Sequence, residues 1–146
     1  MAATMTLFEP VGKVPDPSAL AGFVPCASEE PVAHQLLRPL FGNDCETLLL
    51  AGFDAFQRLV RLERTDGNTV GRCAIPPRCW RALLDGGITD VIMAHNHPSG
   101  IPWPSDADIR TTHDAALFLR TIGIELVDHL IFVPDGHFSF RHAHMM

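Results

Sequence analysis

A loop rich in proline and glycine, set between an apolar run and a long helix, most strongly limits the folds open to this chain. The apolar run at residues 91–94 is typical of a buried strand, and residues 95–104 form the loop that follows it. A long helix is predicted from Ser105 to near Gly123, and the apolar run at residues 124–133 predicts another strand. Because strands and helices alternate here, the sequence predicts an α/β fold with a mixed sheet flanked by helices.

The first half of the chain is expected to supply the remaining elements. Residues 31–41 carry apolar side chains at helical spacing and predict a short helix. Residues 47–53 and 58–64 predict a strand hairpin, with a turn at residues 65–68 after it. Three further elements are predicted: a strand at residues 70–75, a helix from Pro76-Pro77 to Gly86-Gly87, and a last short strand at residues 137–141.

The 146 residues fit one domain, and the N-terminal part differs from the rest in composition. Prolines interrupt regular structure because they lack a backbone N–H. Residues 1–28 are therefore predicted to be an irregular leader, and residues 29–146 to be the folded domain. The prolines of the leader are Pro10, Pro15, Pro17 and Pro25.

Charge, apolar runs and cysteine spacing each bear on the class of protein that the sequence predicts. The net charge is −6, and the 11 Lys and Arg residues form no run, so a basic surface for nucleic acid is not visible. No apolar run has the length of a membrane span and the N-terminus has no signal pattern, so a cytoplasmic protein is expected. No two cysteines form a C-x-x-C pair, which predicts reduced thiols at Cys26, Cys45, Cys73 and Cys79.

Three residues around the loop have the pattern of a metal site. His95 and His97 stand two apart after the predicted strand, and side chains at this spacing point to the same side of an extended chain. Asp108 lies near the start of the following helix, and the loop lets the chain turn back toward the imidazoles. Two neutral nitrogens and one carboxylate leave a position open on a tetrahedral ion, as in catalytic zinc sites. The pattern predicts one zinc ion that activates a water for hydrolysis.

Each part of this pattern also has a purely structural explanation. Histidines at the end of a strand are often simply polar loop residues. Ser105 and Asp108 have the spacing of a helix capping box, in which each side chain binds a backbone N–H of the other. The joint spacing, with seven residues between His97 and Ser105 and two between Ser105 and Asp108, favours the metal site.

The positions of His95, His97, Ser105 and Asp108 resemble the JAMM motif of JAB/MPN-type metalloproteases, and the string HNHPSGIPWPSDADI resembles the bacterial RadC branch. The resemblance implies a single-domain fold related to cytidine deaminases. It implies one zinc ion held by His95, His97 and Asp108. It also implies that the domain hydrolyses an amide or isopeptide bond in a peptide or protein substrate.

The resemblance further implies a glutamate that works as general base and acid beside the zinc water. Glu46 opens the first strand, where the family motif places this glutamate, and is the preferred candidate. Glu63, late in the second strand, is the alternative, and its structural explanation is a pair with an arginine on a neighbouring strand. Ser105 is expected to steady the oxyanion, to cap the helix, or to do both.

Two more residues are candidates for supporting roles. Asp128 is a candidate to accept a hydrogen bond from the second ring nitrogen of His95 or His97, with a structural role in a buried strand as the alternative. Trp103 is expected either to line a substrate cleft or to pack the loop.

A second hypothesis for the function comes from the DNA-repair name of the RadC branch. It describes a factor that acts on or near nucleic acid. Typical members carry an N-terminal helix-hairpin-helix domain, where this chain has the proline-rich leader. Neither the leader nor the charge supports DNA binding, so hydrolysis of a peptide or protein is the first hypothesis.

Overall fold

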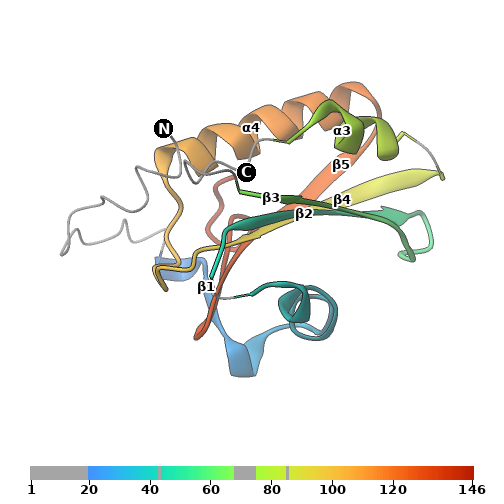
Figure 1. Ribbon diagram of the computed structural model, residues 1–146. Coiled ribbons are helices and arrows are strands. Elements are labelled where there is room, and N and C mark those ends of the chain that lie inside the picture. The colour runs from blue at the N-terminus through green and yellow to red at the C-terminus, as the bar shows by residue number, and fades with distance from the viewer. Residues whose placement is uncertain (1–19, 43, 68–74, 85) are drawn as a thin grey trace.

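The chain folds as one α/β domain around a six-stranded mixed sheet, with helical segments on both faces (Figure 1). The computed structural model describes residues 20–42, 44–67, 75–84 and 86–146. The strand order is β1-β6-β5-β4-β2-β3. The strands are β1 (Phe23–Pro25), β2 (Thr47–Asp54), β3 (Leu59–Asp66), β4 (Ile88–Asn96), β5 (Glu125–Val133) and β6 (Gly136–Ser139). The helical segments are η1 (Cys26–Ser28), η2 (Val32–Leu37), η3 (Arg38–Leu40), α3 (Pro77–Ala82) and α4 (Asp106–Thr121).

The predicted hairpin and the predicted α/β unit are both confirmed. Strands β2 and β3 pair antiparallel, and β4 and β5 pair parallel with α4 connecting them. Two boundaries were wrong: β3 continues to Asp66, into the predicted turn, and β4 continues to Asn96, into the predicted loop. Pairing with β2 extends β3 to Asp66, and pairing with β5 extends β4 to Asn96, because backbone hydrogen bonds do not require apolar side chains.

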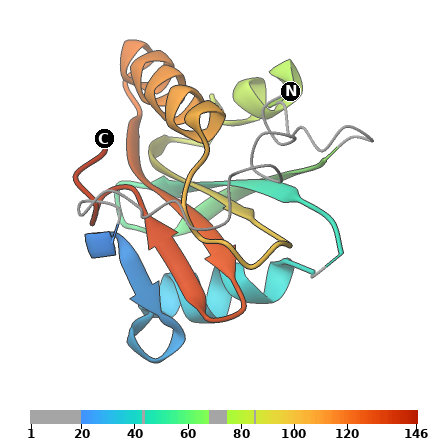
Figure 2. The ribbon, with the colours of Figure 1, turned by 90° about the vertical axis from the view of Figure 1, so that its left-hand side faces the viewer.

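The helical segments lie on both faces of the sheet, with α3 and α4 on one face and η2 on the other (Figure 2). Along β2, Leu48 and Leu50 pack on the side of α3 and α4, whereas Leu49 and Ala51 pack on the side of η2. This alternation is the two-residue period of a strand buried on both faces. The predicted helix at residues 31–41 is present, wound as the π-helix η2 and the 3-10 helix η3.

The prediction of an irregular leader was wrong for its last part. Phe23–Pro25 form the edge strand β1, which pairs antiparallel with β6, and η1 follows directly. Pro25 is tolerated because an edge strand leaves half of its backbone donors unpaired. The rest of the leader, residues 1–19, lies outside the described residues, as does most of the strand predicted at residues 70–75.

Two further expectations concern the described residues as a group. Cys26, Cys45 and Cys79 are free thiols, as predicted, and Cys73 lies outside the described part of the chain. Among the described residues, no helix has the length and apolar character needed to cross a membrane.

Candidate metal centre

The candidate site lies where the end of β4 meets the start of α4. Val91 and Met93 pack on the α4 side of the sheet, so His95, in the same alternation, faces that side as well. His97 follows one residue after the strand ends and turns toward His95. Both imidazoles are almost completely buried, with 3% of each residue exposed.

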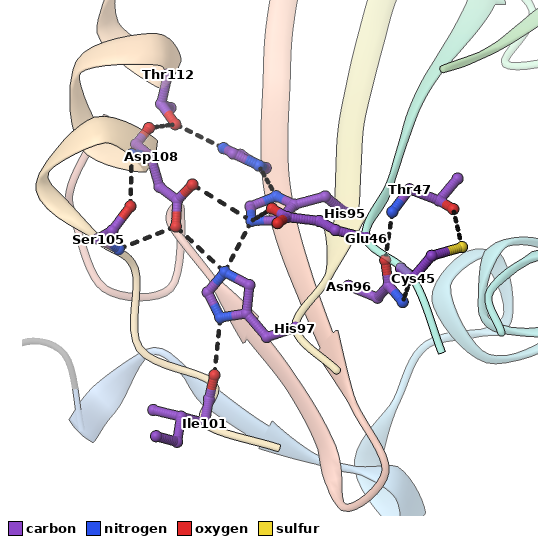
Figure 3. Close-up of polar contacts among 11 residues, drawn as sticks. Cys45, Glu46, Thr47, His95, Asn96, His97, Ile101, Ser105, Asp108 and Thr112 are labelled. Atoms are coloured by element: carbon purple, nitrogen blue, oxygen red, sulfur yellow. Dashed lines mark hydrogen bonds and ion pairs between the residues drawn. The ribbon is translucent and has the colours of Figure 1, made fainter. Parts of the chain in front are cut away.

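Two carboxylates face this pair of imidazoles (Figure 3). The Nε2 atoms of His95 and His97 lie 3.0 Å apart. Asp108 places Oδ1 3.4 Å from Nε2 of His95 and Oδ2 3.3 Å from Nε2 of His97. Glu46 lies 4.0 Å from Nε2 of His95, and the ligand atoms of Glu46, His95 and His97 all lie within 4.8 Å of one another. The cluster therefore offers two nitrogen and two carboxylate ligands for a metal ion.

The helix cap and the contact with the imidazoles are two parts of one arrangement. Oγ of Ser105 accepts the backbone N–H of Asp108 at 3.1 Å, and Oδ2 of Asp108 accepts the backbone N–H of Ser105 at 2.9 Å. The same Oδ2 faces His97. The capping box stabilises the start of α4, and it also holds the Asp108 carboxylate against the two histidines.

Asn96 anchors the segment that carries Glu46. Its Oδ1 accepts the backbone N–H of Thr47 at 2.7 Å, and its Nδ2 donates to the carbonyls of Gly42 and Cys45 at 3.0 and 2.9 Å. Glu46 lies inside this set of bonds, one residue before β2 begins. Asn96 was not among the site residues predicted from the sequence, although its position between the two histidines was a signal.

The second ring nitrogens of the histidines are also engaged. Nδ1 of His97 donates to the backbone carbonyl of Ile101 at 2.8 Å, because a carbonyl oxygen can only accept. Nε2 of His97 therefore carries the lone pair in the neutral ring. Nδ1 of His95 lies 2.7 Å from Nε2 of the buried His129, a residue for which the sequence had not indicated a definite role.

The charges in the cluster shift one another's proton affinity. Burial is the largest cause that raises the pKa of Glu46; His95 and His97 oppose this shift, and Asp108 adds to it. Burial also opposes the charged form of Asp108, but the contacts with His95 and His97 hold its pKa well below the usual range. Burial disfavours a charged His95, yet Asp108 and Glu46 raise its pKa. Two buried carboxylates thus favour a cation at this point.

Glu63 and Asp128 lie outside the cluster. Glu63 is paired with Arg78 of α3 at 3.9 Å, so its partner is an arginine, although not on a neighbouring strand as expected. Asp128 accepts the hydroxyl of Ser139 at 2.6 Å and lines a hollow with Ile92 and Leu130, which pack on the η2 side of the sheet. Adjacent strand residues point to opposite faces, and His129 points to the α4 face. Of the two roles considered for Asp128, the structural role in a buried strand therefore agrees with its contacts, and the role of orienting a ligand histidine does not.

The two remaining candidates lie in the loop and at the helix start. Ser105 is buried, with 2% of the residue exposed, and its hydroxyl caps α4. Trp103 packs against Phe23 and Phe138, with ring centroids 6.3 Å apart in each pair. The loop-packing explanation of Trp103 therefore agrees with its aromatic contacts, which connect the loop to β1 and β6.

A mixed six-stranded sheet with helices on both faces and a candidate metal site at the end of β4 fits a JAB-type fold. The chain belongs to the RadC-like JAB domain family, which it matches over residues 26–145. It is 38% identical over 117 residues to a UPF0758 protein of Paraburkholderia xenovorans, covering 80% of this chain and 46% of that protein. It is 36% identical over 111 residues to a UPF0758 protein of a Marinomonas species, covering 75% of this chain and 49% of that protein. The chain thus spans about half the length of these relatives.

Proposed function

We propose that this domain is a zinc-dependent hydrolase that cleaves an amide or isopeptide bond in a peptide or protein. The observation that carries the proposal is the cluster of two buried imidazoles and two carboxylates at the end of β4. Nitrogen and carboxylate donors of this kind suit zinc, and catalytic zinc sites use three protein ligands and leave a position open.

The distances support His95, His97 and Asp108 as the three ligands. Zinc bonds of about 2.0–2.2 Å place tetrahedral ligand atoms about 3.3–3.6 Å apart. Oδ1 of Asp108 lies 3.4 Å from Nε2 of His95 and Oδ2 lies 3.3 Å from Nε2 of His97, so each oxygen is at such a distance from one of the imidazoles. The 3.0 Å between the two Nε2 atoms is slightly shorter, and a small outward rotation of either ring brings it into range.

Glu46 fits the role of general base and acid better than that of a ligand. At 4.0 Å from Nε2 of His95, Oε1 of Glu46 lies farther away than the roughly 3.3–3.6 Å expected between two ligands of one tetrahedral zinc ion. When bound, zinc lowers the pKa of water at its open position to about 7 and polarises a carbonyl. Glu46 takes a proton from the attacking water and returns it to the leaving amine. In the metal-free site burial raises the pKa of Glu46, and a bound cation would oppose this rise.

Ser105 has a positioning role in this proposal. Its hydroxyl accepts from the backbone N–H of Asp108, and its own N–H holds Oδ2 of the same residue. Both bonds restrict the carboxylate to the orientation in which it meets the imidazoles. The oxyanion role predicted for Ser105 stays a prediction, since it requires the hydroxyl to turn toward a bound substrate.

The test combines zinc content with hydrolysis in the whole chain. We expect about one zinc per chain, and cleavage in a mixed library of quenched fluorescent peptides and lysine isopeptides. Glu46→Gln should keep the zinc and lose hydrolysis by about 10²–10⁴-fold, the usual contribution of general acid–base catalysis. Glu63→Gln is the matched control, and it should keep both zinc and hydrolysis because Glu63 pairs with Arg78 outside the cluster.

The possible failures have separate meanings. If Glu46→Gln loses zinc while Asp108→Asn keeps it, Glu46 is the ligand and the roles of the two carboxylates are exchanged. If the chain binds zinc but cleaves neither peptide nor isopeptide probes, the hydrolase proposal fails. The alternative action on or near nucleic acid stays a prediction, and affinity for a fluorescent DNA duplex that falls steeply with salt would support it.

A further inference from the structure

Behind His95, two residues that the proposed reaction does not use form a chain of hydrogen bonds into the site. Nδ1 of His95 meets Nε2 of His129 at 2.7 Å, and Nδ1 of His129 meets Oγ1 of Thr112 at 2.6 Å. We propose that Thr112 and His129 are a positioning relay that holds His95 in the tautomer with the proton on Nδ1, so that the Nε2 lone pair faces the metal. This inference rests on the proposed function, because it gives the relay a purpose only where His95 binds a metal.

The backbone carbonyl of Asp108 sets the direction of the hydrogen bonds in the relay, because a carbonyl oxygen can only accept. Oγ1 of Thr112 lies 2.6 Å from the backbone carbonyl of Asp108, one helical turn earlier in α4. A carbonyl has no proton, so the single hydroxyl proton of Thr112 is committed to this bond. The hydroxyl oxygen can then only accept from His129, whose Nδ1 must carry a proton.

The proton on Nδ1 of His129 determines which of the other ring nitrogens of His129 and His95 carry protons. A neutral imidazole with a proton on Nδ1 has a lone pair on Nε2, and Nε2 of His129 therefore accepts from Nδ1 of His95. His129 is buried, and its ring nitrogens face Nδ1 of His95 and Oγ1 of Thr112, neither of which carries a negative charge; burial without a carboxylate partner favours the neutral ring. His95 in turn presents the lone pair of Nε2 to His97 and Asp108, where the ion is expected.

Packing holds the relay in this geometry. The ring of His129 stacks on Phe140 at a centroid distance of 4.7 Å and an interplanar angle of 5°. His129 and Thr112 are both buried, with 1% and 0% of each residue exposed, so water does not compete for their hydrogen bonds. Asp108 contributes its carboxylate to the site and its backbone carbonyl to the relay. The relay therefore sets the position of α4 relative to His95.

The experiment compares two substitutions of Thr112 in the full chain. Thr112→Val keeps the shape and removes the hydroxyl, and Thr112→Ser keeps the hydroxyl. Zinc affinity is measured by competition with a chromogenic chelator, and nitrogen NMR of the histidine rings in the metal-free protein reports which nitrogen of His95 carries the proton. We expect Thr112→Val to weaken zinc binding by about 10–100-fold and to lose the uniform Nδ1–H state of His95. Thr112→Ser should resemble the wild type in both measurements.

A second pair of variants protects the test against a general loss of stability. His129→Gln offers an amide oxygen near the place of Nε2 and should retain more zinc affinity than His129→Leu, which offers none. If Thr112→Val binds zinc as the wild type does and keeps Nδ1–H on His95, the relay is overturned while the proposed function stands. If the wild-type chain itself binds no zinc, the proposed function fails and the relay loses its purpose, whichever nitrogen NMR finds protonated.

Discussion

Asn96 is hydrogen-bonded both to the start of β2 and to the segment that carries Glu46, so its substitution should affect both stability and catalysis. Asn96→Ala removes three hydrogen bonds: one accepted from the N–H of Thr47 and two donated to the carbonyls of Gly42 and Cys45. Asn96 is 4% exposed, so water cannot easily replace the lost partners. At a net contribution of about 1 kcal/mol for each hydrogen bond, we expect a loss of about 3 kcal/mol in the free energy of unfolding.

The measurement is urea unfolding followed by circular dichroism, with a thermal scan beside it. A loss of about 3 kcal/mol should lower the Tm by about 6–12 °C in a domain of this size and lower the urea midpoint without changing the slope. Because Glu46 is released from its anchor while His95, His97 and Asp108 are not, we also expect hydrolysis to fall by a larger factor than zinc affinity.

Ser99→Ala is the control for this substitution. The hydroxyl of Ser99 accepts the N–H of Ile101 at 3.3 Å in an exposed part of the same loop, so its removal should change stability by less than about 0.5 kcal/mol. An Asn96→Ala protein with the wild-type urea midpoint would refute the reasoning, since the three buried bonds would then contribute nothing. A loss of stability without any loss of hydrolysis would refute the link to Glu46 alone.

Two further predictions test the frame around the site. Burial opposes the ionisation of Glu29, but its hydrogen bonds, led by that from Arg38, lower its pKa from 4.5 to about 2. The ionised carboxylate therefore contributes about 3 kcal/mol to the free energy of unfolding above pH 4.5, and this contribution is lost as the pH falls toward 2. Acid unfolding should show this loss in the wild type, and an equal slope in Glu29→Gln would speak against it. A methyl group at Gly136 would collide with the carbonyl oxygen of Val24, so Gly136→Ala should displace β1 and lower the free energy of unfolding by about 1–3 kcal/mol. Thermal unfolding measures this loss, and an unchanged Tm would show that β1 does not contribute to stability.

The parts of the fold that were predictable from sequence have local causes. The hairpin of β2 and β3 follows from an apolar run and the run of alternating side chains after it, and α4 follows from the serine and aspartate at capping distance at its start. The spacing of His95 and His97 at the end of a strand was enough to place both rings on one side. These features depend on residues near in sequence, and short-range geometry limits them to few arrangements.

The edges of the fold and the support of the site were not predictable in this way. Strand β1 was missed because three residues ending in Pro25 carry no strand pattern, and its partner β6 is more than a hundred residues away. The cluster of Glu29 with Arg38 and His137 was missed for the same reason, since neighbouring positions in sequence do not reveal a buried ion pair. Such contacts exist only when distant segments pack together.

The sequence by itself determined which groups gather at the candidate site: two imidazoles two residues apart, and a serine and an aspartate at capping distance. Only the tertiary structure decided which groups support them. The pairing of β4 with β5 skips Val127, since Val91 pairs with Leu126 and Ile92 with Asp128. An extra residue in a strand reverses the side to which the following side chains point. This shift places His129 beside His95 and leaves Asp128 on the other face, and no local pattern in the sequence records it.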